Sequence, residues 1–206
     1  MKLLKQLAGA MAAVMLLTSV VVAEDGTKAK AITFKVDPAK STLKWNGKKV
    51  TGEHYGTINL KEGSFTLDGA KLIGGSFVAD MTSLTVQDVT DKDMNGKLAG
   101  HLKSDDFFSV ESHPTAKFVV TKATPKSAGQ YDVTGDLTIK GITKPATFPV
   151  TVKTTANGAE ATGTIVVDRS KYDMKFRSKS FFDANTLGDK LIYDDFTIDV
   201  KLVASK

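Results

Sequence analysis

Apolar and polar residues alternate through most of this chain, and this two-residue period limits the fold more than any other feature. Between residues 130 and 139, Tyr131, Val133 and Leu137 share one parity, while Asp132 and Thr134 share the other. Such alternation is typical of antiparallel strands with one face in the core and the other in water. The pattern predicts about eight or nine strands, near residues 32–36, 41–50, 55–67, 71–82, 116–124, 130–140, 146–154, 160–168 and 191–203.

Many short strands with hardly any helix predict an all-β fold, either a sandwich or a barrel. A closed antiparallel barrel of about eight strands has an interior that side chains just fill, or that holds one small ligand. Gly63 is expected to break the third strand into a hairpin. The one convincing helix is predicted at residues 91–103, because Met94, Leu98 and Leu102 recur at four-residue spacing.

The start of the chain has the features of a secretory signal. Two early lysines precede an apolar run that ends in small residues at Ala23. We therefore expect residues 1–23 to be cleaved off, leaving a polar lead-in at residues 24–31 and one domain at residues 32–206 in the periplasm. An uncleaved membrane anchor is the alternative, although the apolar run is short for a spanning helix.

Charge and cysteine content argue against several classes of protein. The formal net charge of +5 falls by two when the signal is removed, and the lysines are scattered among 23 acidic residues without a basic run. Nucleic acid is therefore not an expected partner. The chain contains no cysteine, so a secreted domain of this kind must be stabilised by an ordinary core or a closed sheet rather than by disulfides.

Motifs for catalysis or metal binding are largely missing. The chain has no GxSxG, P-loop or GxGxxG motif, and His54, His101 and His113 are not spaced as zinc ligands. Residues 91–98 match the first half of a calcium-binding EF loop, but Leu102 stands where the bidentate glutamate belongs. A helix start with acidic residues in its first turn is the other interpretation. We therefore predict no catalytic residue, no metal ion and no cofactor.

The segment 101–118, HLKSDDFFSVESHPTAKF, changes character along its length. Two aspartates offer turn and capping chemistry, and Phe107 and Phe108 then form an apolar pair without helix or strand period. His113 precedes a proline, which favours extended structure just before a strand. Because no nucleophile with a partner base is evident, we expect this segment to close one end of the fold rather than to act as a catalytic loop.

Small side chains occur at several positions on the predicted inward parities, where they would leave room inside a barrel. These positions are Gly74, Gly75, Ala79, Gly135 and Gly163. The alternative is that such glycines mark bends and bulges of the strands.

The two arginines of the chain, Arg169 and Arg177, lie eight residues apart near its end. A planar guanidinium matches phosphate better than an ammonium group does. Both arginines, together with His54, are therefore candidates to bind a polar head group. Surface salt bridges to Asp168 and Asp173 are the alternative for the arginines.

Several motifs together resemble the YceI-like family of secreted bacterial lipid-binding proteins. The central ones are LAGHLKSDDFFSVESHPTAKF at residues 98–118 and GDLTIKGITKPATF at residues 135–148. The strand with Trp45, the sequence GEHYG that follows it, and DRSKYDMKFRS near the end fit as well, so the resemblance covers residues 32–203. It implies an elongated, lipocalin-like antiparallel barrel that holds a long isoprenoid in an apolar interior, and a tendency to form homodimers.

Together these features predict a periplasmic protein that binds a polyisoprenoid lipid, either a prenyl quinone or a prenyl pyrophosphate. The predicted lining residues are Trp45, Phe65, Phe77, Met81, Met94, Leu98, Leu102, Phe107, Phe108, Phe118, Leu137, Ile139, Phe148 and Phe196. Plain core packing is the alternative for each of them. Two alternatives to the carrier role also stay open: a lipid-modifying or metal-assisted enzyme that uses His54 or His101, and a ligand-free structural or stress-response barrel with a filled core.

Overall fold

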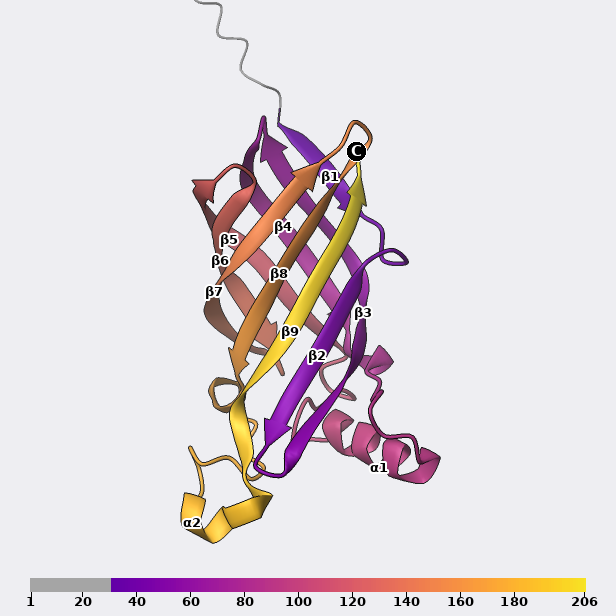
Figure 1. Cartoon of the computed structure of the whole chain (residues 1–206), viewed down its shortest axis with the longest axis vertical. Coiled ribbons are helices and arrows are strands. Elements are labelled where there is room, and N and C mark those ends of the chain that lie inside the picture. Colours follow the sequence, from indigo (N-terminus) through magenta and orange to yellow (C-terminus); the bar gives the residue numbers. More distant parts are fainter. Residues whose placement is uncertain (1–30) are drawn as a thin grey trace, which may run out of the picture.

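The alternating segments form nine antiparallel strands in the computed structural model, which describes residues 31–206 (Figure 1). The strands are β1 (Ile32–Val36), β2 (Thr42–Lys49), β3 (Gly52–Asp68), β4 (Lys71–Asp80), β5 (Thr115–Ser127), β6 (Gln130–Ile139), β7 (Ile142–Thr154), β8 (Gly158–Asp168) and β9 (Ile192–Ser205). The helices are α1 (Lys92–Lys103) and α2 (Ala184–Leu187), with short 3₁₀ helices at Met81–Ser83, Arg169–Tyr172 and Gly188–Lys190. The predicted signal sequence lies outside the described residues.

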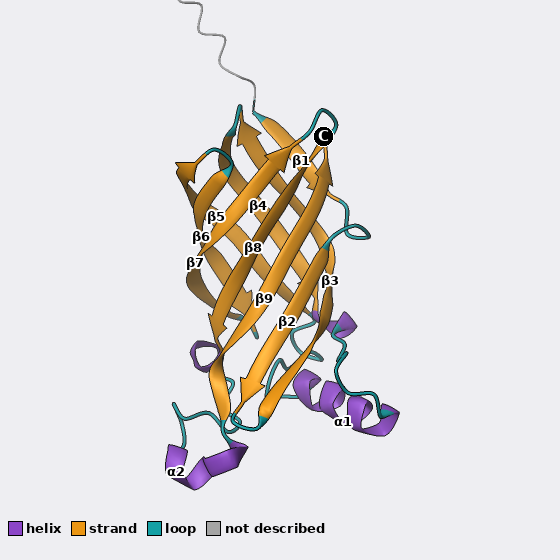
Figure 2. Cartoon of the chain, viewed as in Figure 1, coloured by secondary structure: helices purple, strands orange, loops and turns teal. Residues whose placement is uncertain are grey.

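The strands close into a barrel with eight positions around its circumference (Figure 2). Strands β1 and β2 share one position between β3 and β9: β1 pairs with the end of β3, and β2 pairs with its start. Pairing of β3 with β4 completes the circle. The predicted antiparallel barrel is thereby confirmed, and its closure removes the free strand edges that an open sheet would have to protect.

The expected hairpin break at Gly63 is wrong. Strand β3 continues through this residue, and only a shift of its register against β4, between Leu60 and Glu62, marks the place. Glycine is needed there for packing, because a β-carbon at position 63 would lie 2.7 Å from Cδ1 of Phe77 on β4. The glycine that suggested a turn is therefore explained by the close approach of the Phe77 ring to the backbone of β3.

Strand β7 begins at Ile142, earlier than the predicted residue 146. Lys140 and Gly141, with φ angles of 51° and 73°, form the two-residue turn between β6 and β7. A turn with two positive φ angles matches the twist of the flanking strands, so the ladder extends to the pairing of Ile139 with Ile142.

The two ends of the barrel are built differently (Figure 2). One end carries the short turns after β3, β5 and β7, together with the start of β1 and the end of β9. The other end carries the long connections at residues 81–114 and 169–191, which contain the helices. We call the first the closed end and the second the mouth.

Helix α1 lies at the mouth, where its first turn extends beyond the barrel wall (Figure 1). The Asp91 carboxylate caps this turn by accepting a hydrogen bond from the Met94 amide at 2.9 Å, and the Asn95 side chain donates to two carbonyls of the preceding loop. The calcium interpretation is not supported, because residues 92–103 are helical and residues 31–206 contain no cluster of three potential metal-binding side chains. Within the same range, no helix has the length and apolar character to cross a membrane.

Candidate ligand cavity

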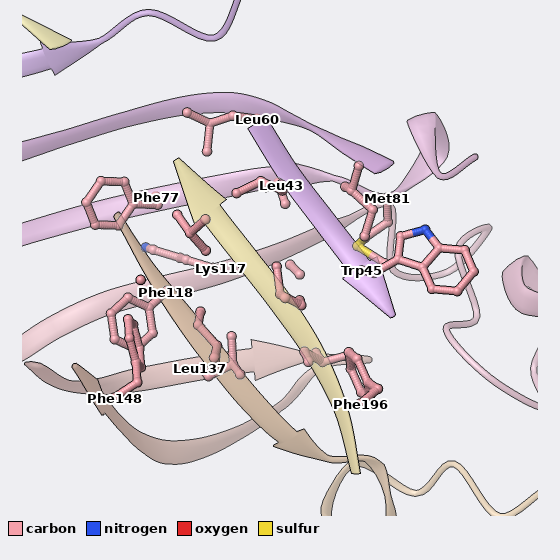
Figure 3. Close-up of a pocket in the computed structure, with 18 of the residues that line it drawn as sticks. Leu43, Trp45, Leu60, Phe77, Met81, Lys117, Phe118, Leu137, Phe148 and Phe196 are labelled. Atoms are coloured by element: carbon pink, nitrogen blue, oxygen red, sulfur yellow. The ribbon is translucent and has the colours of Figure 1, made fainter. Parts of the chain in front are cut away.

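The inward faces of the strands enclose a cavity of about 230 Å³ inside the barrel (Figure 3). All the predicted lining residues except Met94 border it, namely Trp45, Phe65, Phe77, Met81, Leu98, Leu102, Phe107, Phe108, Phe118, Leu137, Ile139, Phe148 and Phe196. Further apolar residues on the inward faces of the strands also line the cavity, and the same alternation is the signal for them, although they were not predicted: Leu43, Ile58, Leu60, Leu72, Val133, Val150, Val152, Ile165, Ile198 and Leu202. The wall of the cavity is therefore almost wholly apolar.

Three phenylalanine rings lie against glycines of the barrel wall. A β-carbon at Gly135 would be 2.4 Å from Cζ of Phe118, and one at Gly163 would be 3.6 Å from the ring of Phe148. Figure 3 shows the rings of Phe77, Phe118 and Phe148 grouped at one side of the pocket, and those of Phe118 and Phe148 are 5.2 Å apart. Of the small residues predicted to leave room, Ala79 and Gly163 border the cavity, whereas Gly74, Gly75 and Gly135 do not. Gly135 and Gly163 instead allow large rings to lie close to the wall.

The mouth of the cavity is covered by α1 and by the segment that follows it. Leu98 and Leu102 of the helix and the pair Phe107 and Phe108 all border the cavity. The Phe108 ring meets that of Phe196 on β9 edge to face, with 6.0 Å between centroids. The expectation that this segment closes one end agrees with its position, and we call these four residues the lid.

Met94 does not belong to the lid. Its side chain is 57% exposed, and it does not border the cavity. Although Met94 shares a helix face with Leu98, it lies one turn closer to the start of α1, where the helix does not border the cavity. Helical spacing identified the face correctly but could not show where the barrel wall ends.

Arg169 is buried and committed to the fold, contrary to its predicted role at a head group. Its side chain borders the cavity, but its guanidinium donates to the carbonyl oxygens of Tyr193, Met174 and Ile192 at 2.8–3.1 Å and lies 3.5 Å from the Asp194 carboxylate. Burial lowers the pKa of Arg169, and the nearby carboxylates partly offset this effect. Few donors of this side chain are left for a ligand, and its ion pair is with Asp194 rather than with the predicted aspartates.

Arg177 lies outside the cavity lining. Its side chain is exposed and its guanidinium stacks on Phe176, with 4.9 Å between Cζ and the ring centroid. Its φ angle of 51° is left-handed, and its carbonyl accepts a hydrogen bond from the Ile192 amide. The two arginines therefore do not form a joint anion site, because Arg169 faces inward and Arg177 faces solvent.

His54 borders the cavity at the mouth and is held by Asp88. Its Nδ1 lies 2.7 Å from one Asp88 carboxylate oxygen, while the other oxygen accepts from the Tyr55 amide at 3.0 Å. Burial alone would raise the pKa of Asp88, but the hydrogen bonds from Tyr55 and His54 outweigh it and hold the pKa below its ordinary value. Nothing near His54 in the sequence pointed to Asp88, since the two residues meet only through folding.

His101 has a different environment. Its Nε2 lies 2.9 Å from an Asp106 carboxylate oxygen, and its ring packs edge to face against Phe107 and Phe176. His54 and His101 thus interact with separate carboxylates. The geometry does not join them into a single acid–base pair of the kind that the enzyme interpretation would use.

The barrel is similar to proteins of known sequence and structure. The YceI-like domain family matches residues 34–204. A UPF0312 protein from Shewanella denitrificans is 34% identical over 93 residues, 45% of this chain, and the match spans 46% of that relative's length. Burkholderia cenocepacia BcnA has a TM-score of 0.66 and 26% identity, covering 82% of this chain and 99% of BcnA. A polyisoprenoid binding domain from Saccharophagus degradans shares the fold at 17% identity with a TM-score of 0.57, covering 84% and 97% of the two chains.

Proposed function

Since this chain belongs to the YceI-like domain family, we propose that it is a periplasmic carrier that holds the apolar tail of a polyisoprenoid inside its barrel. The ligand would be a prenyl quinone or a prenyl pyrophosphate, taken up by burial alone. The fold shared with the polyisoprenoid binding domain of Saccharophagus degradans supports this choice of ligand.

The observation that carries the proposal is an apolar cavity inside a closed barrel, bordered by residues from every strand position. Each methylene transferred from water to such a site contributes about 0.8 kcal/mol. A prenyl tail with many such carbons therefore has a large favourable free energy of transfer from water into the cavity. A polar substrate would lose its hydrogen bonds to water and would find few partners on a wall that is almost wholly apolar.

The lid must move for a long tail to enter. The cavity of about 230 Å³ is smaller than the range of about 300–1,000 Å³ that holds drug-sized ligands. The strands are held by continuous ladders, whereas Phe107 and Phe108 lie in a connection outside them. Loading is therefore expected to displace the lid and to leave the barrel wall in place.

The polar head group would lie at the mouth beside His54 and Lys49, which both border the cavity. Asp88 orients the imidazole through Nδ1, so Nε2 is the ring atom left for a ligand. If the ligand is a prenyl pyrophosphate, Lys49→Gln lowers its affinity several-fold, because an ammonium–phosphate contact is lost. The same change has little effect on ubiquinone, which carries no charge.

The test of the proposal is native mass spectrometry of protein purified gently from a bacterial periplasm, followed by solvent extraction. A stoichiometric bound species that is released by solvent and identified as a prenyl compound supports it. A clean apoprotein mass, together with no uptake of added ubiquinone or prenyl pyrophosphate, would overturn it and favour the barrel with a filled core.

Two neighbouring residues of β8 provide a matched control. Ile165 is buried and borders the cavity, whereas Val166 is 60% exposed on the outer face of the same strand. Ile165→Phe should reduce lipid uptake by filling the cavity, and Val166→Phe should leave it unchanged. Trp45, the only tryptophan, borders the cavity and reports binding of a quinone by fluorescence quenching.

Localisation requires a separate measurement, because the predicted signal lies outside the described residues. We expect the protein in the periplasmic fraction with Glu24 as its first residue, as determined by N-terminal sequencing. Retention in the membrane fraction with an intact N-terminus would instead favour the uncleaved anchor.

A further inference from the structure

The closed end of the cavity is filled by side chains, and we infer that they set the longest isoprenoid tail that the barrel can hold. This inference rests on the proposed function, because it concerns the ligand of the same cavity. We call the side chains that fill this end the floor: Phe34, Val36, Leu67, Tyr131, Ala159 and Ala204.

The floor begins at successive inward positions on several strands. Val133 on β6, Ala161 on β8 and Leu202 on β9 border the cavity. The next inward residues toward the closed end, Tyr131, Ala159 and Ala204, do not border it. All six floor residues are between 2% and 6% exposed, so the cavity stops against packed side chains and not at an opening to solvent.

Two aromatic rings hold the floor in place. The hydroxyl group of Tyr131 on β6 donates a hydrogen bond to the Ala70 carbonyl in the turn between β3 and β4, past the intervening strand β5. Phe34 on β1 stacks on Phe65 of β3, with 5.5 Å between centroids and 15° between planes. Phe65 borders the cavity, whereas Phe34, its partner across the β1–β3 ladder, does not, so the cavity ends at this stack.

Because the floor is fixed and the lid opposite it can move, the depth of the barrel limits the length of tail that can be buried. An isoprenoid that enters tail first gains affinity with each unit that it buries, until the tail reaches the floor. Further units would remain at the mouth in water and add nothing. Affinity should therefore rise with chain length and then level off at a length that the floor determines.

The experiment measures the affinity of a series of ubiquinones with increasing side-chain length, by quenching of Trp45 fluorescence. Phe34→Ala deepens the cavity and should move the plateau to longer chains. Ala161→Phe fills the layer above the floor and should move it to shorter chains, with a roughly tenfold or greater loss for the longest chains that the wild type accommodates. The control is Ile73→Ala, because Ile73 is 49% exposed on the outside of β4 near the same end. This substitution should leave the plateau in place.

The outcomes separate this inference from the proposed function. If the wild type binds no ubiquinone and no prenyl pyrophosphate of any length, the carrier function itself fails. If it binds but the plateau stays in place in folded Phe34→Ala, the floor is not the determinant. Should Phe34→Ala fail to fold, Leu67→Ala removes side-chain volume from the same floor and is expected to give the same shift to longer chains, and circular dichroism establishes which variants are folded.

Discussion

The ring of Phe118 on β5 lies so close to Gly135 on β6 that a β-carbon at position 135 would sit 2.4 Å from its Cζ atom. Gly135 belongs to a strand that pairs with both β5 and β7, and Phe148 of β7 packs on Phe118 from the other side. The glycine lets two aromatic rings share one stretch of wall. The space left between opposite walls of the barrel depends on this arrangement.

Gly135→Ala is expected to push the Phe118 ring into the cavity. Overpacking of this kind typically costs about 1–3 kcal/mol, and the displaced ring would also occupy space that a ligand needs. We expect a lower free energy of unfolding in urea and a loss of prenyl binding. Gly74→Ala is the control, because a β-carbon there meets no atom within 4 Å; equal losses in both variants would contradict the packing argument.

Arg169→Lys is expected to destabilise the protein by about 3 kcal/mol or more, because one ammonium group cannot reach three separate carbonyls and would leave the Asp194 carboxylate poorly paired. Chemical denaturation measures the change. Arg177→Lys is the matched control, since this side chain is exposed, and should stay within about 0.5 kcal/mol of the wild type. A near-neutral Arg169→Lys would mean that the arginine is not a structural residue.

Helix α1 is weakened by two glycines, Gly96 and Gly100, around which added β-carbons would meet no atom within 4 Å. Gly96→Ala and Gly100→Ala should each stabilise the helix by about 0.5–1 kcal/mol, seen as slower amide exchange of residues 92–103. Gly141→Ala should instead lower the free energy of unfolding, because the φ angle of 73° at this position is strained for alanine and the β-carbon would lie 3.0 Å from His113. Faster exchange in the α1 variants would show that the glycines are needed for helix packing.

Acid should weaken the attachment of the loop that carries Asp88. The pKa of Asp88 is lower in the folded protein than its ordinary value. The Asp88 carboxylate therefore contributes its full stabilisation of the fold above the ordinary pKa, and this stabilisation is lost as the pH falls through the folded pKa. Asp88→Asn should therefore reduce the drop in unfolding free energy between neutral pH and about pH 3 by up to about 1 kcal/mol. An identical pH profile for wild type and variant would exclude this role.

The architecture of this protein could be predicted from its sequence because strand alternation is a local property. Tyr131, Val133 and Leu137 share a parity, and each faces inward on β6 as that parity requires. Motifs at residues 98–118 and 135–148 were enough to indicate the family, and the family match over residues 34–204 bears this out. Most of the cavity wall followed from the same alternation.

Contacts between distant segments could not be predicted in this way. Gly63 suggested a turn because its contact with Phe77 is not visible in the sequence. Met94 was predicted to line the cavity because the sequence does not show where the barrel wall ends. Arg169 was predicted to bind an anion because its carbonyl partners cannot be recognised in the sequence. The sequence by itself determined the strands, their inward faces and the family. Only the tertiary structure decided where the cavity ends, which side chains seal its floor and which hold its mouth, because those roles depend on residues that meet across the barrel and not on residues that are neighbours in the chain.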